Sequence, residues 1–252
     1  HRIARRQRQM CIRDRYIKQQ KDAEARANAM GFDKVSKLKL EVGKSIKEFV
    51  AGGGFLFTMC SGTDSFDISM AAESTDICEY MFDGDAADPS AQSKLNYNKS
   101  LAFKNFTLKT NPMEYEFSDI DGTALHKLPE NQDLFTLFEF SAKWDIVPTL
   151  LCQNHTRIIK GFMGQTTDFK TSLVKSNVLI MGESKVFGTA RYIHGQYGKG
   201  QWTFYGGHDP EDYRHYVNDP ITDLNLYPNS PGYRLILNNI LFPAAKKKKQ
   251  KT

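Results

Sequence analysis

The stretch from residue 33 to residue 73 constrains the fold more than any other part of the chain. Its first part repeats apolar residues at spacings of three, four and seven, which places them on one helix face. The glycines at 52–54 end that helix, and the next residues form an apolar run, F-L-F-T-M, typical of a buried parallel strand. After a tight turn at Cys60, a second helix is predicted, with Asp64 or Ser65 as its N-cap. Helix, strand, sharp turn and helix make one repeat of a doubly wound α/β fold.

The C-terminal third predicts further elements of the same kind. We expect a strand at N-V-L-I-M-G-E, a hairpin with its turn at 198–200, and a final helix from Pro231 to Leu241. Near the other end, residues 16–30 predict a polar helix that Gly31 stops. These elements favour a single α/β domain.

The middle of the chain is less regular. Three short runs read as strands: S-L-A-F-K-N-F-T-L, L-F-T-L-F-E-F-S-A and I-V-P-T-L-L. We therefore predict one α/β domain over 16–245 with a β-rich insertion over about 75–170.

Positive charge is concentrated at the two ends of the chain. Residues 1–15 carry six Arg against one Asp, and the tail A-A-K-K-K-K-Q-K-T carries five Lys with no acid. Because each end contributes +5 to a total of +5, the body between them has a net charge of −5. An acidic body does not support a nucleic-acid groove. Residues 246–252 are expected to form a basic, disordered tail.

The N-terminal residues resemble translated sequencing-adaptor DNA, in the string R-Q-R-Q-M-C-I-R-D-R. We therefore expect residues 1–15 to be a non-native head and the chain to be truncated at its N-terminus. No apolar run reaches 18 residues, so no transmembrane segment is expected. With the true N-terminus expected to be missing, localisation stays open between the cytoplasm and the periplasm.

Cys60 is the cysteine whose position predicts chemistry. A thiol between a strand and a helix gains thiolate character from the helix N-terminus, and backbone N–H groups of the turn can hold a developing oxyanion. His208 directly follows the predicted strand W-T-F-Y and would serve as the base. Asp209 or Glu211 would orient the imidazole and complete a Cys/His/carboxylate triad. The cysteines show no C-x-x-C pairing, so neither a zinc site nor a disulfide framework is predicted.

The order of these features resembles the class I glutamine amidotransferase superfamily, including its trehalose-utilisation (ThuA-like) branch. The resemblance rests on the Cys60 turn and on the later stretch G-K-G-Q-W-T-F-Y-G-G-H-D-P-E. It implies a flavodoxin-like fold and, in the amidotransferase members, release of ammonia from glutamine by a G-x-C-x-G elbow and an H-x-E motif. The elbow cysteine would be Cys60, the following glycine Gly62 and the histidine His208. Thr58 stands where the elbow has its first glycine, and the acids follow His208 by one and three residues rather than two.

Residues 16–252 also resemble a group of bacterial proteins labelled asparagine synthetase B. The resemblance is carried by the stretches G-G-G-F-L-F-T-M-C-S, M-E-Y-E-F-S-D-I-D, G-F-M-G-Q-T-T, F-Y-G-G-H-D-P-E-D-Y and N-S-P-G-Y-R-L-I-L-N-N-I-L-F-P-A-A-K-K-K-K-Q-K-T. Proteins of this group are longer at the N-terminus, which agrees with the expected truncation.

Three functions stay open. The first is hydrolysis of glutamine or another carboxamide, or amide transfer, by a Cys/His/acid site. The second is a non-catalytic ThuA-like domain that binds a ligand or serves as a scaffold. The third compares S-G-T-D-S at 61–65 with the S-G-G-x-D-S loop of ATP pyrophosphatases, which would cradle phosphate and hold Mg²⁺ through Asp64. The residues assigned to substrate binding are Ser61, Gly62, Asp64 and Gly207.

The expected ligands follow from these functions. The first two need no cofactor or metal, whereas the third needs ATP and Mg²⁺. The expected partner is a small-molecule substrate, with no nucleic acid, and a homo-oligomer stays open.

Overall fold

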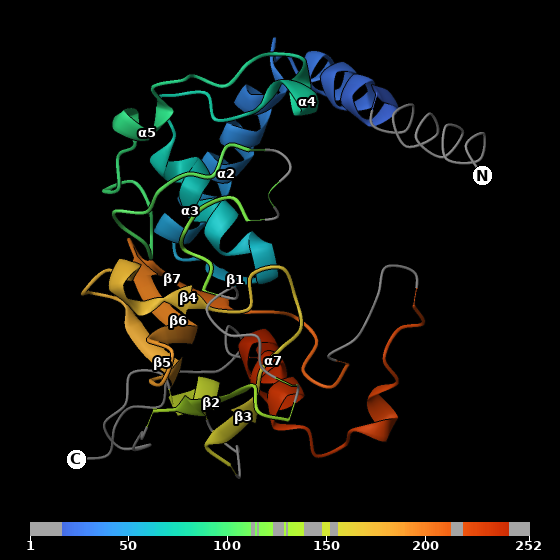
Figure 1. The fold of residues 1–252 in the computed structure, drawn as a ribbon, viewed down its shortest axis with the longest axis vertical. Helices are drawn as coiled ribbons and strands as arrows, with labels where there is room; N and C mark the ends of the chain where they lie inside the picture. Colours follow the sequence, from blue (N-terminus) through green and yellow to red (C-terminus); the bar gives the residue numbers. More distant parts are fainter. Residues whose placement is uncertain are drawn as a thin grey trace.

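The computed structural model describes residues 17–111, 114, 116–122, 129, 131–138, 148–151, 156–212 and 219–241. The expectations for the head and the tail, and for Cys11 and Cys152, lie outside these residues. In the described part, helices and strands form a mixed α/β structure around one curled sheet (Figure 1). The coarse prediction of an α/β fold is therefore confirmed.

The predicted helix, strand, turn and helix are present in that order. Helix α2 spans Val35–Ala51, β1 spans Phe55–Met59, the 3-10 turn η1 spans Cys60–Gly62 and α3 spans Asp64–Ala71. A further helix covers 17–29, as the polar composition predicts. This part of the sequence prediction is confirmed.

Among the described residues, seven strands form one sheet in the order β1-β7-β6-β5-β2-β3, with β4 paired to β6. Only β1 and β7 pair in parallel there, and the other strand pairs are antiparallel. The predicted hairpin is β6–β7, in which Tyr197 pairs with Gly200. The strands other than β1 are β2 (Leu134–Leu137), β3 (Ile158–Lys160), β4 (Phe169–Lys170), β5 (Leu179–Ser184), β6 (Thr189–Tyr197) and β7 (Gly200–Tyr205).

Helices cover both faces of this sheet (Figure 1). Adjacent residues of a strand point to opposite faces, and β7 illustrates the result. Phe204 packs in the cluster that includes α3, whereas Tyr205 packs in the cluster that includes α7 (Pro231–Leu241). The bounds of α7 match the predicted final helix.

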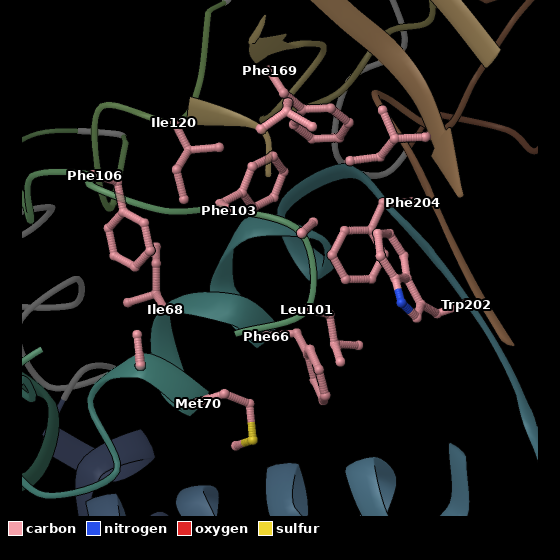
Figure 2. Close-up of a cluster of buried hydrophobic side chains, with 14 of the residues drawn as sticks. Phe66, Ile68, Met70, Leu101, Phe103, Phe106, Ile120, Phe169, Trp202 and Phe204 are labelled. Carbon is pink, nitrogen blue, oxygen red and sulfur yellow. The ribbon is translucent and has the colours of Figure 1, made fainter. Parts of the chain in front are cut away.

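The cluster between α3 and the sheet fixes the start of α3. Phe66 and Met70 of α3 lie with Trp202 and Phe204 of β7 in a buried group (Figure 2). The ring centroids of Phe66 and Phe204 are 6.4 Å apart, and those of Trp202 and Phe204 are 4.7 Å apart. Because buried aromatic side chains contribute much of the packing free energy, this cluster also holds the turn at Cys60 in place.

Residues 100–108, predicted as a strand, form isolated bridges instead, one of them at Phe103. The reason is the buried carboxylate of Asp67 in α3. It accepts hydrogen bonds from the N–H groups of Leu101, Ala102 and Phe103 at 2.7, 2.6 and 2.8 Å. In a strand, these N–H groups would donate to the carbonyls of a neighbouring strand. Here the Asp67 carboxylate is the acceptor, so these N–H groups form no strand pairing.

Two other predicted strands are only partly present. L-F-T-L forms β2, and residues 139–142 lie outside the described part. P-T-L-L is not a strand but the short helix α6, Pro148–Leu151, since proline suits the first helical position, where its missing N–H is not needed. The remaining short helices are α4 (Tyr80–Asp83), α5 (Ala91–Lys94), η3 (Thr171–Leu173) and η4 (Leu224–Leu226). No helix in the described residues has the length and apolar character needed to cross a membrane.

Candidate functional site

Cys60 lies on the turn between β1 and α3 in a strained backbone conformation. Its φ of 54° falls in the left-handed region, which residues with a side chain rarely adopt. Such strain costs roughly 1–3 kcal/mol and persists only where the surroundings impose it. The N–H and hydroxyl of Thr63 donate to the Cys60 carbonyl at 3.1 and 2.6 Å. Thr63 is the N-cap residue of α3, so the prediction of Asp64 or Ser65 as N-cap is wrong.

His208 reaches Cys60 because β1 and β7 are parallel neighbours. Met59 at the end of β1 lies opposite Tyr205 at the end of β7. The carboxyl ends of both strands therefore lie at the same edge of the sheet. There the Cys60 N–H donates to the Gly207 carbonyl at 3.2 Å. His208 lies close enough to the Cys60 thiol to act on its pKa as a hydrogen-bond partner. The residues proposed as nucleophile and base are thus neighbours in space, although 148 positions separate them in the sequence.

The surroundings favour the thiolate of Cys60. Burial acts to raise the pKa of this thiol, but hydrogen bonds from His208 and from three backbone N–H groups outweigh it and lower the pKa to about 7. The N–H groups belong to Ser61, Gln165 and Thr166. The hydrogen bond to Cys60 raises the pKa of His208 in turn, against the opposing effect of burial. The arrangement favours a thiolate beside an imidazolium.

Cys78 has the opposite setting. Burial is the largest cause that raises the pKa of its thiol, and the carboxylates of Asp83 and Asp76 add to it, giving a pKa of about 12. Neither Cys60 nor Cys78 forms a disulfide. At neutral pH we therefore expect a thiolate at Cys60 and a neutral thiol at Cys78.

Two hydroxyl groups hold the carboxylate of Asp209 in place. It accepts a hydrogen bond from Tyr233 at 2.9 Å and another from Thr222 at 3.2 Å. After the hydrogen bond to Cys60, the charge of Asp209 is a further cause that raises the pKa of His208. Asp209 therefore acts on His208 through its charge.

Glu211, the other acidic candidate, faces a cation instead. Its carboxylate lies 3.8 Å from the ammonium group of Lys160 at the end of β3. Sequence spacing left Asp209 and Glu211 as alternatives, and these contacts favour Asp209 as the partner of the imidazole.

The residues assigned to substrate binding lie in different settings. The backbone N–H of Ser61 is one of the groups that lower the pKa of the Cys60 thiol. Gly62 is exposed, and a Cβ added there would meet its nearest neighbour only at 3.9 Å. Gly207 is buried with a φ of 73°, and a Cβ there would lie 2.6 Å from the Phe162 carbonyl oxygen. Gly207 is therefore required for close packing rather than exposed for ligand contact.

Asp64 points into the protein rather than toward solvent, with a relative exposure of 1%. It accepts a hydrogen bond from the Thr166 hydroxyl at 3.2 Å, while burial and the charge of Asp121 raise its pKa to about 7. Within the described ranges, no group of three or more His, Cys, Asp or Glu side chains is arranged to hold a metal ion. The position of Asp64 therefore gives no support to a Mg²⁺-binding phosphate loop.

The loop at 163–167 belongs to the site, although sequence reasoning assigned it no role. The Gln165 N–H donates to the Cys60 Sγ at 2.9 Å. Carbonyl groups of the same loop accept hydrogen bonds from the N–H groups of Gly207 and His208, at 2.7 and 2.6 Å. The available signal was the stretch G-F-M-G-Q-T-T, since two glycines so close together can mark a place where backbones approach each other.

Comparison of the chain with known proteins identifies no relative. No model of a protein family matches it. No curated protein matches it, and neither does any solved structure.

Proposed function

We propose that the protein is a cysteine-dependent enzyme of the class I glutamine amidotransferase-like type. It would hydrolyse a carboxamide such as glutamine, or transfer the amide nitrogen to an acceptor. The observation that carries the proposal is that Cys60, on a strained turn, and His208 follow the ends of two neighbouring parallel strands, close enough for His208 to lower the pKa of the thiol. A thiol beside a base, with backbone donors around it, is the arrangement that nucleophilic catalysis requires.

The chemistry follows from the positions of these groups. His208 accepts the thiol proton, and the Cys60 sulfur forms a bond to the carboxamide carbon, whose oxygen takes the negative charge. The Ser61 N–H on the turn would stabilise that oxyanion. When the C–N bond breaks, the imidazolium gives its proton to the nitrogen and ammonia leaves. A water molecule, deprotonated by His208, then attacks the thioester and releases the carboxylic acid and the free thiol.

The fold supports the same class. The parallel pair β1–β7 is covered by helices on both faces of the sheet (Figure 1), and Cys60 follows the carboxyl end of β1. Open α/β sheets bind ligands at this edge. On these grounds we propose the flavodoxin-like arrangement, with an antiparallel extension beyond β7.

Replacing Cys60 with alanine is expected to lower ammonia release from glutamine by about 10³-fold or more, because the nucleophile is lost. His208→Ala is expected to lower it by about 100-fold or more, since the general base and acid are lost. The measurement is ammonia and glutamate formation by purified full-length protein.

Cys78→Ala is the matched control and should retain the wild-type rate, because Cys78 lies in a different part of the molecule and has a thiol pKa of about 12. The proposal is wrong if Cys60→Ala keeps the activity. It is also wrong if the wild-type protein releases ammonia from neither glutamine nor other carboxamides.

A further inference from the structure

The Gln165 N–H is a backbone donor to the sulfur of the candidate nucleophile. It lies 2.9 Å from the Cys60 sulfur and comes from a loop 105 positions away in the chain. Hydrogen bonds to charged groups are stronger than those between neutral groups. A donor this close therefore stabilises the thiolate more than the thiol.

Two glycines allow the loop to come this close. A Cβ at Gly164 would lie 3.1 Å from the Cys60 sulfur and 2.8 Å from the Gly207 Cα. A Cβ at Gly206 would lie 2.0 Å from the Thr167 carbonyl oxygen. Side chains at positions 164 and 206 would push the loop and the end of β7 apart, and the donor would move away from the sulfur.

The same loop is joined to the segment that carries His208. The N–H groups of Gly207 and His208 donate to the carbonyls of Thr166 and Met163, and the Met163 N–H donates to the Asp209 carbonyl at 3.1 Å. The donor and the base are therefore parts of one hydrogen-bonded unit. A change in the position of the loop would change both contacts of the thiol.

We propose that the Gln165 N–H is a catalytic group that holds Cys60 as a thiolate, and that Gly164 is the positioning residue that brings it to the sulfur. The assignment of the Gln165 N–H depends on the proposed function only for the identity of the substrate that the thiolate attacks. The ionisation of Cys60 is measured without a substrate, so the two proposals can fail separately.

Gln165→Pro tests the donor, because proline has no N–H, and Gln165→Ala is its matched control, because alanine keeps the N–H. We expect Gln165→Pro to lower the rate of Cys60 alkylation by iodoacetamide at pH 7 by about fivefold to tenfold. The pH at which this rate is half-maximal should also move upward in Gln165→Pro, and both changes should be clearly larger than in Gln165→Ala, which keeps the N–H. Thermal melting shows whether each variant is folded.

A measurement on the wild-type protein avoids the question of folding. The amide proton of Gln165 should change its NMR chemical shift with pH, with the same midpoint near pH 7 as the alkylation of Cys60. If this signal does not titrate, or if folded Gln165→Pro alkylates at the wild-type rate, the proposal is overturned. If glutamine is not hydrolysed but these results hold, the proposed function fails while the assignment of the donor stands.

Discussion

At pH 7, iodoacetamide is expected to alkylate Cys60 on the order of several hundred times faster than Cys78 in the same molecule. With a pKa of about 7, roughly half of the Cys60 thiol is ionised at this pH, whereas the pKa of Cys78 is about 12. The thiolate fractions then differ by about 10⁵-fold, and the greater nucleophilicity of the more basic thiolate recovers about two to three orders of magnitude. Above pH 7 the Cys60 rate should level off while the Cys78 rate continues to rise. Peptide mass spectrometry of timed samples measures both rates.

The variant His208→Ala tests the origin of this reactivity. It removes the hydrogen bond that most strongly lowers the pKa of Cys60 and should reduce its alkylation at pH 7 by about tenfold. Cys78 in the same sample is the internal control and should not change. Equal rates at Cys60 and Cys78 in the wild-type protein would mean that the turn does not activate its thiol.

Replacing Arg191 with methionine is expected to lower the free energy of unfolding by about 3–5 kcal/mol. Arg191 is buried in β6, with its guanidinium paired to Asp133 and 3.7 Å from the Asp168 carboxylate. Both aspartates have a relative exposure of 0%, so removal of the cation leaves two buried anions without its charge. Urea unfolding followed by circular dichroism measures the change.

Lys185→Met is the matched control for this prediction. Lys185 also lies beside a carboxylate, that of Glu183 at 3.5 Å, but its side chain is 85% exposed. Exposed ion pairs contribute about 0–1 kcal/mol, so this variant should unfold close to the wild-type midpoint. If both variants lose the same small amount, the buried ion cluster does not stabilise the fold as argued.

The parts of the fold that the sequence predicts are those in which local signals and burial agree. The helical spacing before the glycines at 52–54, and the apolar run after them, predict α2 and β1. The contact between Cys60 and His208 could also be anticipated, because each follows a predicted strand and such strand ends share an edge when the strands are parallel neighbours.

The parts that the sequence did not predict depend on contacts between distant residues. Nothing in the run at 100–108 indicates that the Asp67 carboxylate would take its N–H groups. Similarly, the choice between Asp209 and Glu211 depends on Tyr233 and Lys160, which come from other elements. Local patterns carry no information on such pairings.

The most direct test of the proposed function is covalent labelling by a diazoketone analogue of glutamine, which forms a thioether with an activated cysteine nucleophile. We expect one label on each chain, at Cys60, with the labelling suppressed by excess glutamine and largely lost in His208→Ala. Intact-protein mass and peptide mapping give the number and the position of the labels. Absence of labelling, or labelling at Cys78 as fast as at Cys60, would contradict a Cys60–His208 site that acts on carboxamides.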